Sequence, residues 1–284
     1  MDVVKVLLIA SLFCLLIPVS HSQFVLESVD VVVSDIQPDG TVKVKENIKL
    51  IIQGEYYHEL YDTGYIGYAS NDLAFWSSAT ELKDVKKHIN PDKGSITEFT
   101  LTPQPRGKCN PAQEICHGEL VVEYQVSPIY NESEGMDKAT EGTGLFTIDD
   151  YKPRTTKYKL NVDALSFTTT DQGNILLDER VYFTIKLPDG TIVTKLNPIP
   201  ENEDVNIPAR MTELSWTDLV LVNFVVEFDV EKSLEEEVTE FFLGFVQFIE
   251  NAVTGPYGFA IIIIIVIIIG GYLYINTAKR KKEE

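Results

Sequence analysis

The stretch 29–50, VDVVVSDIQPDGTVKVKENIKL, decides the fold class of this chain. Val29–Ser34 is rich in β-branched residues, and Thr41–Leu50 alternates apolar with polar side chains, as a half-buried strand does. Between them, the tripeptide Pro38–Gly40 supplies a proline with a preset φ angle, an aspartate that caps the turn and a glycine that tolerates positive φ. The stretch therefore predicts two antiparallel strands joined by a tight turn.

The same turn chemistry occurs further along the chain. Val181–Leu187 and Thr191–Leu196 flank a second Pro-Asp-Gly at 188–190, which predicts a second hairpin. Short apolar segments between turn residues predict further strands at Ser95–Leu101, Glu119–Val126, Thr156–Ala164, Met211–Trp216 and Val220–Asp229. Many short strands with frequent turns indicate a mainly β protein built from one or two antiparallel β-sandwich-like units.

The segment 128–144 divides the β region. It is rich in glycine and polar residues, as a linker or long loop is. We therefore expect one sandwich-like unit over 23–127 and a second over 145–230. The alternative is a single larger sandwich in which the two halves are merged.

The two ends of the sequence have the composition of targeting and membrane segments. Residues 1–22 combine a lysine, a short apolar run and small residues before Gln23, which predicts a cleaved signal peptide. Residues 256–276 are almost entirely apolar and are long enough for one transmembrane helix, and the basic tail 277–284 predicts that the C-terminus lies in the cytoplasm. We expect a single-pass type I protein of the cell membrane, or of the endoplasmic reticulum membrane if the source is eukaryotic.

The segment 231–255 differs from the β region that precedes it. Its apolar side chains recur at three- and four-residue spacing, with glutamates mostly at the other positions, so an amphipathic juxtamembrane helix is predicted. Its phenylalanines could lie in the membrane interface, pack against the β region or contact a partner helix. These residues are Phe241, Phe242, Phe245 and Phe248.

Composition and motifs restrict the function. The chain has 43 Asp and Glu against 24 Lys and Arg, a net charge of −19, which excludes a basic nucleic-acid-binding surface and favours cationic or basic partners. No metalloprotease, nucleotide-binding or nucleophile-elbow motif occurs. We predict a non-enzymatic protein without a cofactor or metal. The alternative is a hydrolase that uses paired carboxylates, for which Asp149-Asp150 and Glu201–Asp204 are candidates.

Glu55–Tyr68 contains five tyrosines and two glycines, and Trp76 follows. Tyrosines on glycine-hinged loops form adaptable binding surfaces, because each offers a rigid ring and one hydroxyl group. We predict a binding patch here, although the same rings could instead seal one end of a sandwich. The patch residues are Tyr56, Tyr57, Tyr61, Tyr65, Tyr68 and Trp76.

Two modifications are predicted outside that patch. Cys109 and Cys116 are the cysteines that follow the signal peptide, and in an oxidising compartment they are expected to form a disulfide. A zinc site that adds His117 to the two cysteines is the alternative. Asn131, in the sequence Asn-Glu-Ser, is a candidate glycosylation site.

The Val29–Leu50 hairpin resembles the start of the extracytoplasmic β domain in uncharacterised single-span membrane proteins of archaea and bacteria. The order of signal peptide, β region, single span and basic tail is similar to theirs as well. Because the clear sequence signals concern placement and no reactive constellation occurs, we expect a membrane-anchored protein with a binding or structural role at the cell surface. An accessory subunit of a translocation or glycosylation complex, with the 231–255 helix as its partner face, is the alternative.

Overall fold

The structure, a computed structural model, describes residues 23–67, 71–110, 112, 114–130, 139–152, 155–200, 206–231, 242–243 and 246–247. The chain divides into a compact unit that ends at Val230 and a second unit that begins at Glu231. The predicted signal peptide, transmembrane segment and basic tail lie outside the described residues, as do Asn131 and Tyr68. Within the described ranges, no helix has the length and apolar character that a membrane crossing requires.

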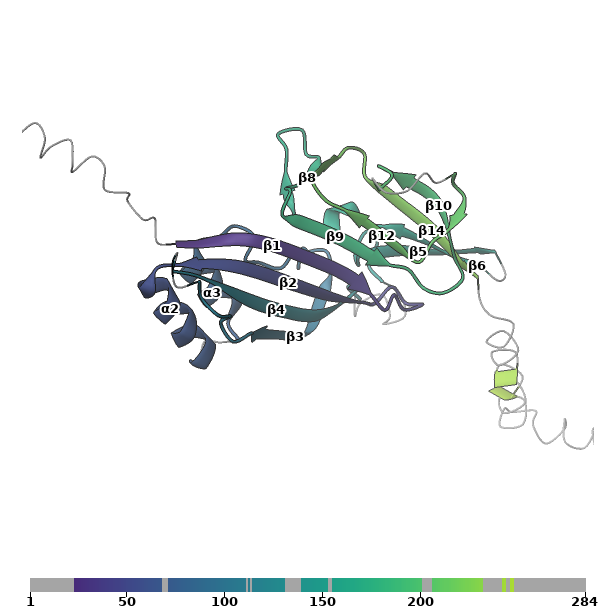
Figure 1. The fold of residues 1–284 in the computed structure, drawn as a ribbon. Helices are drawn as coiled ribbons and strands as arrows, with labels where there is room; N and C mark the ends of the chain where they lie inside the picture. Colours follow the sequence, from purple (N-terminus) through teal and green to yellow (C-terminus); the bar gives the residue numbers. More distant parts are fainter. Residues whose placement is uncertain are drawn as a thin grey trace, which may run out of the picture. The chain divides into compact units, whose positions relative to one another are not determined.

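The first unit is mainly β, as predicted, and most of its strand pairs are antiparallel (Figure 1). Its largest sheet has six strands in the order β12-β9-β1-β2-β4-β3. Their bounds are β1 Gln23–Ser34, β2 Val42–Gln53, β3 Ser95–Pro103, β4 Ile115–Ser127, β9 Val181–Lys186 and β12 Glu213–Trp216.

Two smaller sheets complete the β structure of this unit. The five-stranded sheet has the order β11-β10-β14-β6-β5, and the three-stranded sheet has the order β13-β8-β7. The five strands are β5 Phe146–Lys152, β6 Thr155–Leu160, β10 Thr191–Asn197, β11 Ala209–Arg210 and β14 Val225–Glu231. The three are β7 Thr168–Thr169, β8 Ile175–Leu177 and β13 Leu219–Leu221, and a short 3-10 helix, η2, spans Val162–Ala164.

The first predicted hairpin is confirmed. Strands β1 and β2 pair antiparallel from Gln23 opposite Gln53 to Ser34 opposite Lys43. In the turn, the Gly40 N–H donates to the Gln37 carbonyl at 3.0 Å, and Gly40 has a φ of 85°. The turn residues therefore act as their chemistry predicts.

The second predicted hairpin is wrong. The turn after β9 forms, because the Thr191 N–H donates to the Pro188 carbonyl at 3.3 Å, but β9 and β10 belong to different sheets. Strand β9 lies between β1 and β12, whereas β10 lies between β11 and β14. Each strand thus pairs with partners that are distant in sequence, and such long-range pairing cannot be derived from a local turn motif.

Strands from both sides of the 128–144 segment share the six-stranded sheet. Val29–Val33 of β1 pairs in parallel with Val181–Ile185 of β9. The buried hydrophobic residues also form one continuous cluster, which extends from Phe24 to Phe228. Strands from both predicted units therefore belong to one compact unit and share one set of buried residues.

Two helices lie beside the six-stranded sheet, and the first of them lies in a region that was expected to be loop (Figure 1). Helix α2 spans Glu55–Ile66 and α3 spans Leu73–Thr80. The prediction of glycine-hinged loops over Glu55–Tyr68 is therefore wrong. The reason is that Tyr57, Tyr61 and Gly64 recur at helical spacing and face the β structure, where Tyr61 and Gly64 are buried.

Alternation along β2 and β4 places one set of side chains in the core. On β2 this set includes Val44, Ile48 and Leu50, and it also contains a charged residue, Glu46, which is fully buried. On β4 the buried set includes Cys116, Leu120 and Tyr124. The buried face of the sheet therefore carries the two polar features that are described below.

Beyond Glu231, which ends β14, the described residues of the second unit are Phe242, Leu243, Val246 and Gln247, and these four are helical. Phe242, Leu243 and Val246 are more than half exposed. The other predicted contact residues of the 231–255 helix, Phe241, Phe245 and Phe248, lie outside the described residues.

Candidate functional site

Helix α2 is fixed to the sheet by Tyr61. The Tyr61 hydroxyl donates to the carbonyls of Gln104 at 2.8 Å and Glu119 at 3.1 Å, and it accepts from the Glu119 N–H at 3.0 Å. Its ring occupies space left by Gly118, where an added Cβ would lie 2.5 Å from the ring. The close approach of α2 to β4 therefore depends on a glycine that faces a tyrosine.

Helix α3 packs against α2 through Trp76. The Asp72 side chain caps α3 by accepting from the Ala74 N–H at 2.9 Å. Trp76 is fully buried, and its ring centroid lies 5.2 Å from that of Tyr61. An added Cβ at Gly64 would lie 2.8 Å from the Trp76 ring, so a glycine again permits the close contact.

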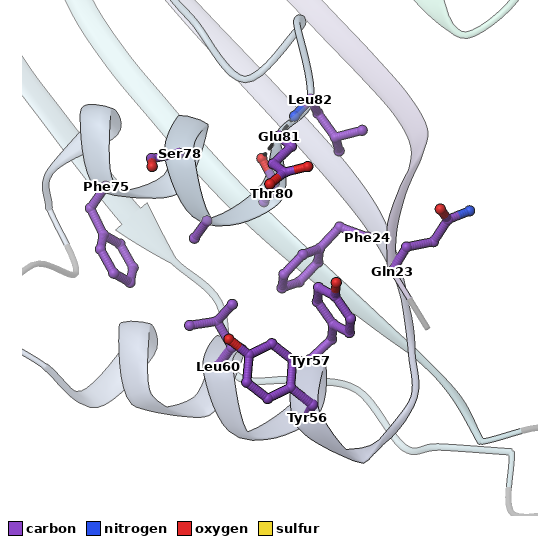
Figure 2. Close-up of a pocket in the computed structure, with 11 residues that line it drawn as sticks. Gln23, Phe24, Tyr56, Tyr57, Leu60, Phe75, Ser78, Thr80, Glu81 and Leu82 are labelled. Carbon is purple, nitrogen blue, oxygen red and sulfur yellow. Dashed lines mark hydrogen bonds between the residues drawn. The ribbon is translucent and has the colours of Figure 1, made fainter. Parts of the chain in front are cut away.

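An aromatic cleft with a volume of about 510 Å³ lies between α2, α3 and the start of β1 (Figure 2). The Tyr57 ring contacts Phe24 and Tyr56 edge to face, at centroid distances of 5.2 and 5.1 Å. Figure 2 shows Leu60 beside these rings and Phe75 on the facing helix α3. The cleft is lined by Gln23, Phe24, Tyr56, Tyr57, Leu60, Phe75, Ser78, Ala79, Thr80, Glu81 and Leu82.

One lining side chain of the cleft is charged, and it is acidic. Glu81 is the charged side chain among its eleven lining residues, which include no lysine, arginine or histidine. Glu81 ends α3 in a left-handed conformation, and its N–H donates to the Ser77 carbonyl. Tyr56 is 66% exposed at the rim. The cleft thus offers accessible aromatic rings and one carboxyl group, which suit a ligand that is apolar and neutral or cationic.

The structure separates the predicted patch into surface and core. Tyr56 and Tyr57 line the cleft, whereas Tyr61 and Trp76 are fully buried beneath it. Tyr65 is 38% exposed and is not a lining residue. Residues that sequence analysis did not assign to the patch, namely Phe24, Leu60, Phe75 and Leu82, complete the cleft. Recognising α2 as a helix would have placed Leu60 beside Tyr56 and Tyr57.

Burial raises the pKa of Tyr61 to about 12, and the hydrogen bond with the Glu119 backbone opposes part of this rise. A folded-state pKa above the ordinary value of about 10 favours the folded state at pH values below 10, and this contribution is lost as the pH rises through 12. We expect the free energy of unfolding of the wild type to fall by about 2–3 kcal/mol more than that of Y61F between pH 9 and pH 12. Urea unfolding across this range measures the difference.

The control for this experiment is Y182F, which changes an exposed tyrosine on β9. Y61F also removes three hydrogen bonds. That loss lowers the free energy of unfolding by the same amount at every pH, so it does not change how the free energy of unfolding depends on pH. Parallel curves for the wild type and Y61F would contradict the prediction.

The predicted disulfide between Cys109 and Cys116 is present, with an S–S distance of 2.04 Å. A cation and an imidazole lie against it. Arg106 Nη1 is 2.7 Å from Cys109 Sγ and 3.2 Å from Cys116 Sγ, and His58 Nε2 is 3.0 Å from Cys116 Sγ. Sequence analysis missed both residues, because His58 lies on α2 and meets Cys116 only through the fold.

Asp62 positions the guanidinium group. Arg106 donates to both Asp62 carboxylate oxygens, through Nε at 3.0 Å and Nη2 at 2.7 Å. These hydrogen bonds hold the pKa of Asp62 below its ordinary value and raise the pKa of Arg106. His58 and Asp62 are four residues apart, so both project from the same side of α2 toward the disulfide.

The structure does not bring His117 to the cysteines as the zinc alternative requires. Neighbouring residues of a strand point to opposite faces, so Cys116 is buried while His117 is exposed. His117 Nδ1 instead lies 2.9 Å from Glu27 Oε2. The three potential metal donors that do lie within 4.8 Å of one another are His58, Cys109 and Cys116.

A hydrolase with paired carboxylates needs two carboxyl groups in its cleft. Among the residues that line the aromatic cleft, Glu81 is the one acidic residue. Asp149 lies on β5. The Asp150 side chain and the segment Glu201–Asp204 are outside the described residues.

Comparisons with known proteins identify no family. No protein-family model and no curated protein matches the sequence. A structural comparison finds native leukotriene A4 hydrolase from Saccharomyces cerevisiae, with 9% sequence identity and a TM-score of 0.30. The match covers 74% of this chain and 30% of the hydrolase, so the chain spans less than a third of that protein's length. Neither the identity nor the TM-score supports a shared fold or activity.

Proposed function

We propose that this protein is a non-enzymatic, membrane-anchored binding protein whose β unit lies outside the cytoplasm and holds a basic segment of a partner polypeptide in the aromatic cleft. The observation that carries the proposal is the cleft itself, where the exposed ring of Tyr56 and the partly exposed rings of Tyr57 and Phe75 line a space whose charged lining side chain is a glutamate. The membrane anchor and the extracytoplasmic location rest on the sequence of residues 1–22 and 256–284.

The charge of the molecule supports a basic ligand. The chain carries a net charge of −19, and the outer part of α2 adds the exposed residues Glu55 and Glu59 near the cleft. A lysine or arginine side chain can lie over the face of a tyrosine ring while its charge approaches Glu81. Complementary charge also increases the rate at which such a partner associates.

Site-specific photo-crosslinking tests this proposal. We expect benzoylphenylalanine at position 56, in the full-length protein in its native membrane, to form an adduct with a discrete partner protein. The control places the same group at position 182, an exposed tyrosine on β9 away from the cleft. Nona-arginine should reduce the adduct several-fold, whereas nona-glutamate should not.

Two results would contradict the proposal. An equal adduct yield at positions 56 and 182 would mean that the cleft has no special role. Competition by nona-glutamate but not by nona-arginine would exclude a basic ligand.

A further inference from the structure

The groups around the Cys109–Cys116 disulfide match its reduced form better than its oxidised form. A disulfide sulfur is neutral and a weak hydrogen-bond acceptor, whereas a thiolate is an anion that a nearby arginine or histidine stabilises. Here Arg106 Nη1 approaches both sulfurs, and His58 Nε2 approaches Cys116 Sγ. A cation that contacts both sulfurs therefore favours reduction of the bond and makes the disulfide a stronger oxidant.

The loop that contains the cysteines is also held by its backbone. The Asn110 N–H donates to the Ile115 carbonyl at 2.8 Å, and the Gly107 N–H donates to the His117 carbonyl at 2.8 Å. These hydrogen bonds close the same short loop that the disulfide closes. Reduction therefore leaves the two ends of the loop held together by backbone hydrogen bonds, as a reversible redox site requires.

The two sulfurs differ in accessibility. Cys116 is fully buried on the inner face of β4, whereas Cys109 is partly exposed on the preceding loop. An attacking thiolate can therefore reach Cys109 Sγ and not Cys116 Sγ. This asymmetry assigns Cys109 as the sulfur that is attacked and Cys116 as the leaving group.

We propose that Cys109–Cys116 is a redox-active disulfide that exchanges with dithiols of extracytoplasmic polypeptides. A substrate thiolate attacks Cys109 Sγ, the Cys109–Cys116 bond breaks, and Cys116 leaves as a thiolate beside His58 and Arg106. The second thiolate of the substrate then attacks the substrate sulfur that is bonded to Cys109. The substrate disulfide forms, and Cys109 leaves as a thiolate beside Arg106. Two electrons pass from the substrate dithiol to the protein, and the two thiol protons pass to solvent or to the released cysteines.

A metal site is the competing use of the same atoms, because His58, Cys109 and Cys116 supply three nitrogen and sulfur donors. The guanidinium group of Arg106 lies against both sulfurs, where its positive charge opposes a bound cation. Redox exchange is therefore the use that the local charge favours.

The test equilibrates the full-length protein in glutathione buffers and measures the Cys109 and Cys116 thiols by alkylation and peptide mass spectrometry. R106Q removes the charge that stabilises the released thiolate, so its disulfide should be harder to reduce. Half-reduction should need a ratio of [GSH]² to [GSSG] about tenfold higher than in the wild type. This tenfold change corresponds to one pKa unit of the released thiolate. R106K keeps the charge and should stay near the wild type. R180Q, at an arginine that contacts the Leu26 carbonyl elsewhere, is the matched control.

The direction of the change separates a redox role from a structural one. Loosening the fold would expose the disulfide and make it easier to reduce, whereas the proposal predicts that R106Q is harder to reduce. D62N removes the carboxylate that neutralises Arg106 and should shift the midpoint in the opposite direction from R106Q. A shift of both variants in the same direction would overturn the proposal.

Trapping tests the assignment of the attacked sulfur. With oxidised glutathione as the probe, Cys109 in C116A should form a mixed disulfide at least about tenfold faster than Cys116 in C109A, because only the former sulfur is accessible. Equal rates would overturn the assignment. If stoichiometric Zn²⁺ protects the reduced thiols from alkylation, the proposal is overturned and the residues form a metal site instead.

Discussion

Replacing His88 with leucine is expected to lower the free energy of unfolding by about 3–5 kcal/mol, because it leaves the buried carboxylate of Glu46 without its side-chain partner. His88 is 1% exposed, and Glu46 is fully buried. His88 Nδ1 lies 2.8 Å from Glu46 Oε2, and the His88 backbone N–H donates to Glu46 Oε1 at 2.9 Å. In H88L, Oε2 of the buried Glu46 carboxyl group loses its side-chain partner.

Tyr124 completes this cluster by donating its hydroxyl hydrogen to Glu46 Oε1. Burial, followed by the charge of Glu46, holds the pKa of Tyr124 well above its ordinary value. The hydroxyl therefore stays protonated and continues to donate. His88 also contacts Phe167, with ring centroids 5.1 Å apart, so the cluster connects β2 and β4 to the segment before β7.

A double variant separates the buried carboxyl group from simple packing. E46Q/H88L removes the imidazole and the charge of residue 46 but keeps a side-chain oxygen that accepts from the Tyr124 hydroxyl and the residue 88 N–H, and a buried neutral group without a partner costs less than a buried charge. We expect the double variant to be more stable than H88L. Urea unfolding of the full-length protein in detergent, followed by tryptophan fluorescence, compares the two. Equal destabilisation of H88L and E46Q/H88L would show that an unpaired charge at Glu46 does not determine the cost.

Strand alternation contains the information that Glu46 is buried. In Thr41–Leu50, the apolar positions Val42, Val44 and Ile48 share the phase of Glu46, and this phase faces the core. A charged residue in the buried phase predicts a buried partner, but it does not identify that partner. His88 is 42 residues away, and its approach depends on the packing of the segment after α3.

The aromatic cleft and the side chains around the Cys109–Cys116 disulfide were less predictable for a related reason. The tyrosines of Glu55–Ile66 were interpreted as a loop because helical signals are weak there, yet packing against Gly118 and Trp76 stabilises a helix. Once α2 forms, it brings His58 to a cysteine that is 58 residues away. Local patterns indicate the strands and the disulfide, whereas sites between elements depend on tertiary contacts.

The other large effect is expected at Trp76, where W76A should lower the free energy of unfolding by about 3–5 kcal/mol. Trp76 is fully buried, and it contacts Tyr61 on α2 and Phe75 on α3, with centroid distances of 5.2 and 5.4 Å. Removing the indole leaves a cavity between the two helices that form the cleft. Trp216 remains in W76A as a fluorescence probe of unfolding.

Phe75 provides the matched control, because it is the neighbouring aromatic residue on α3 but lines the cleft and is only partly buried. F75A should cost less stability than W76A, since part of its ring is already in contact with water. At a temperature where both variants are folded, F75A should nevertheless reduce photo-crosslinking from position 56, because it removes a wall of the cleft. A W76A variant as stable as the wild type would show that Trp76 does not stabilise the two helices. An unchanged crosslink in F75A would show that Phe75 does not contribute to binding in the cleft.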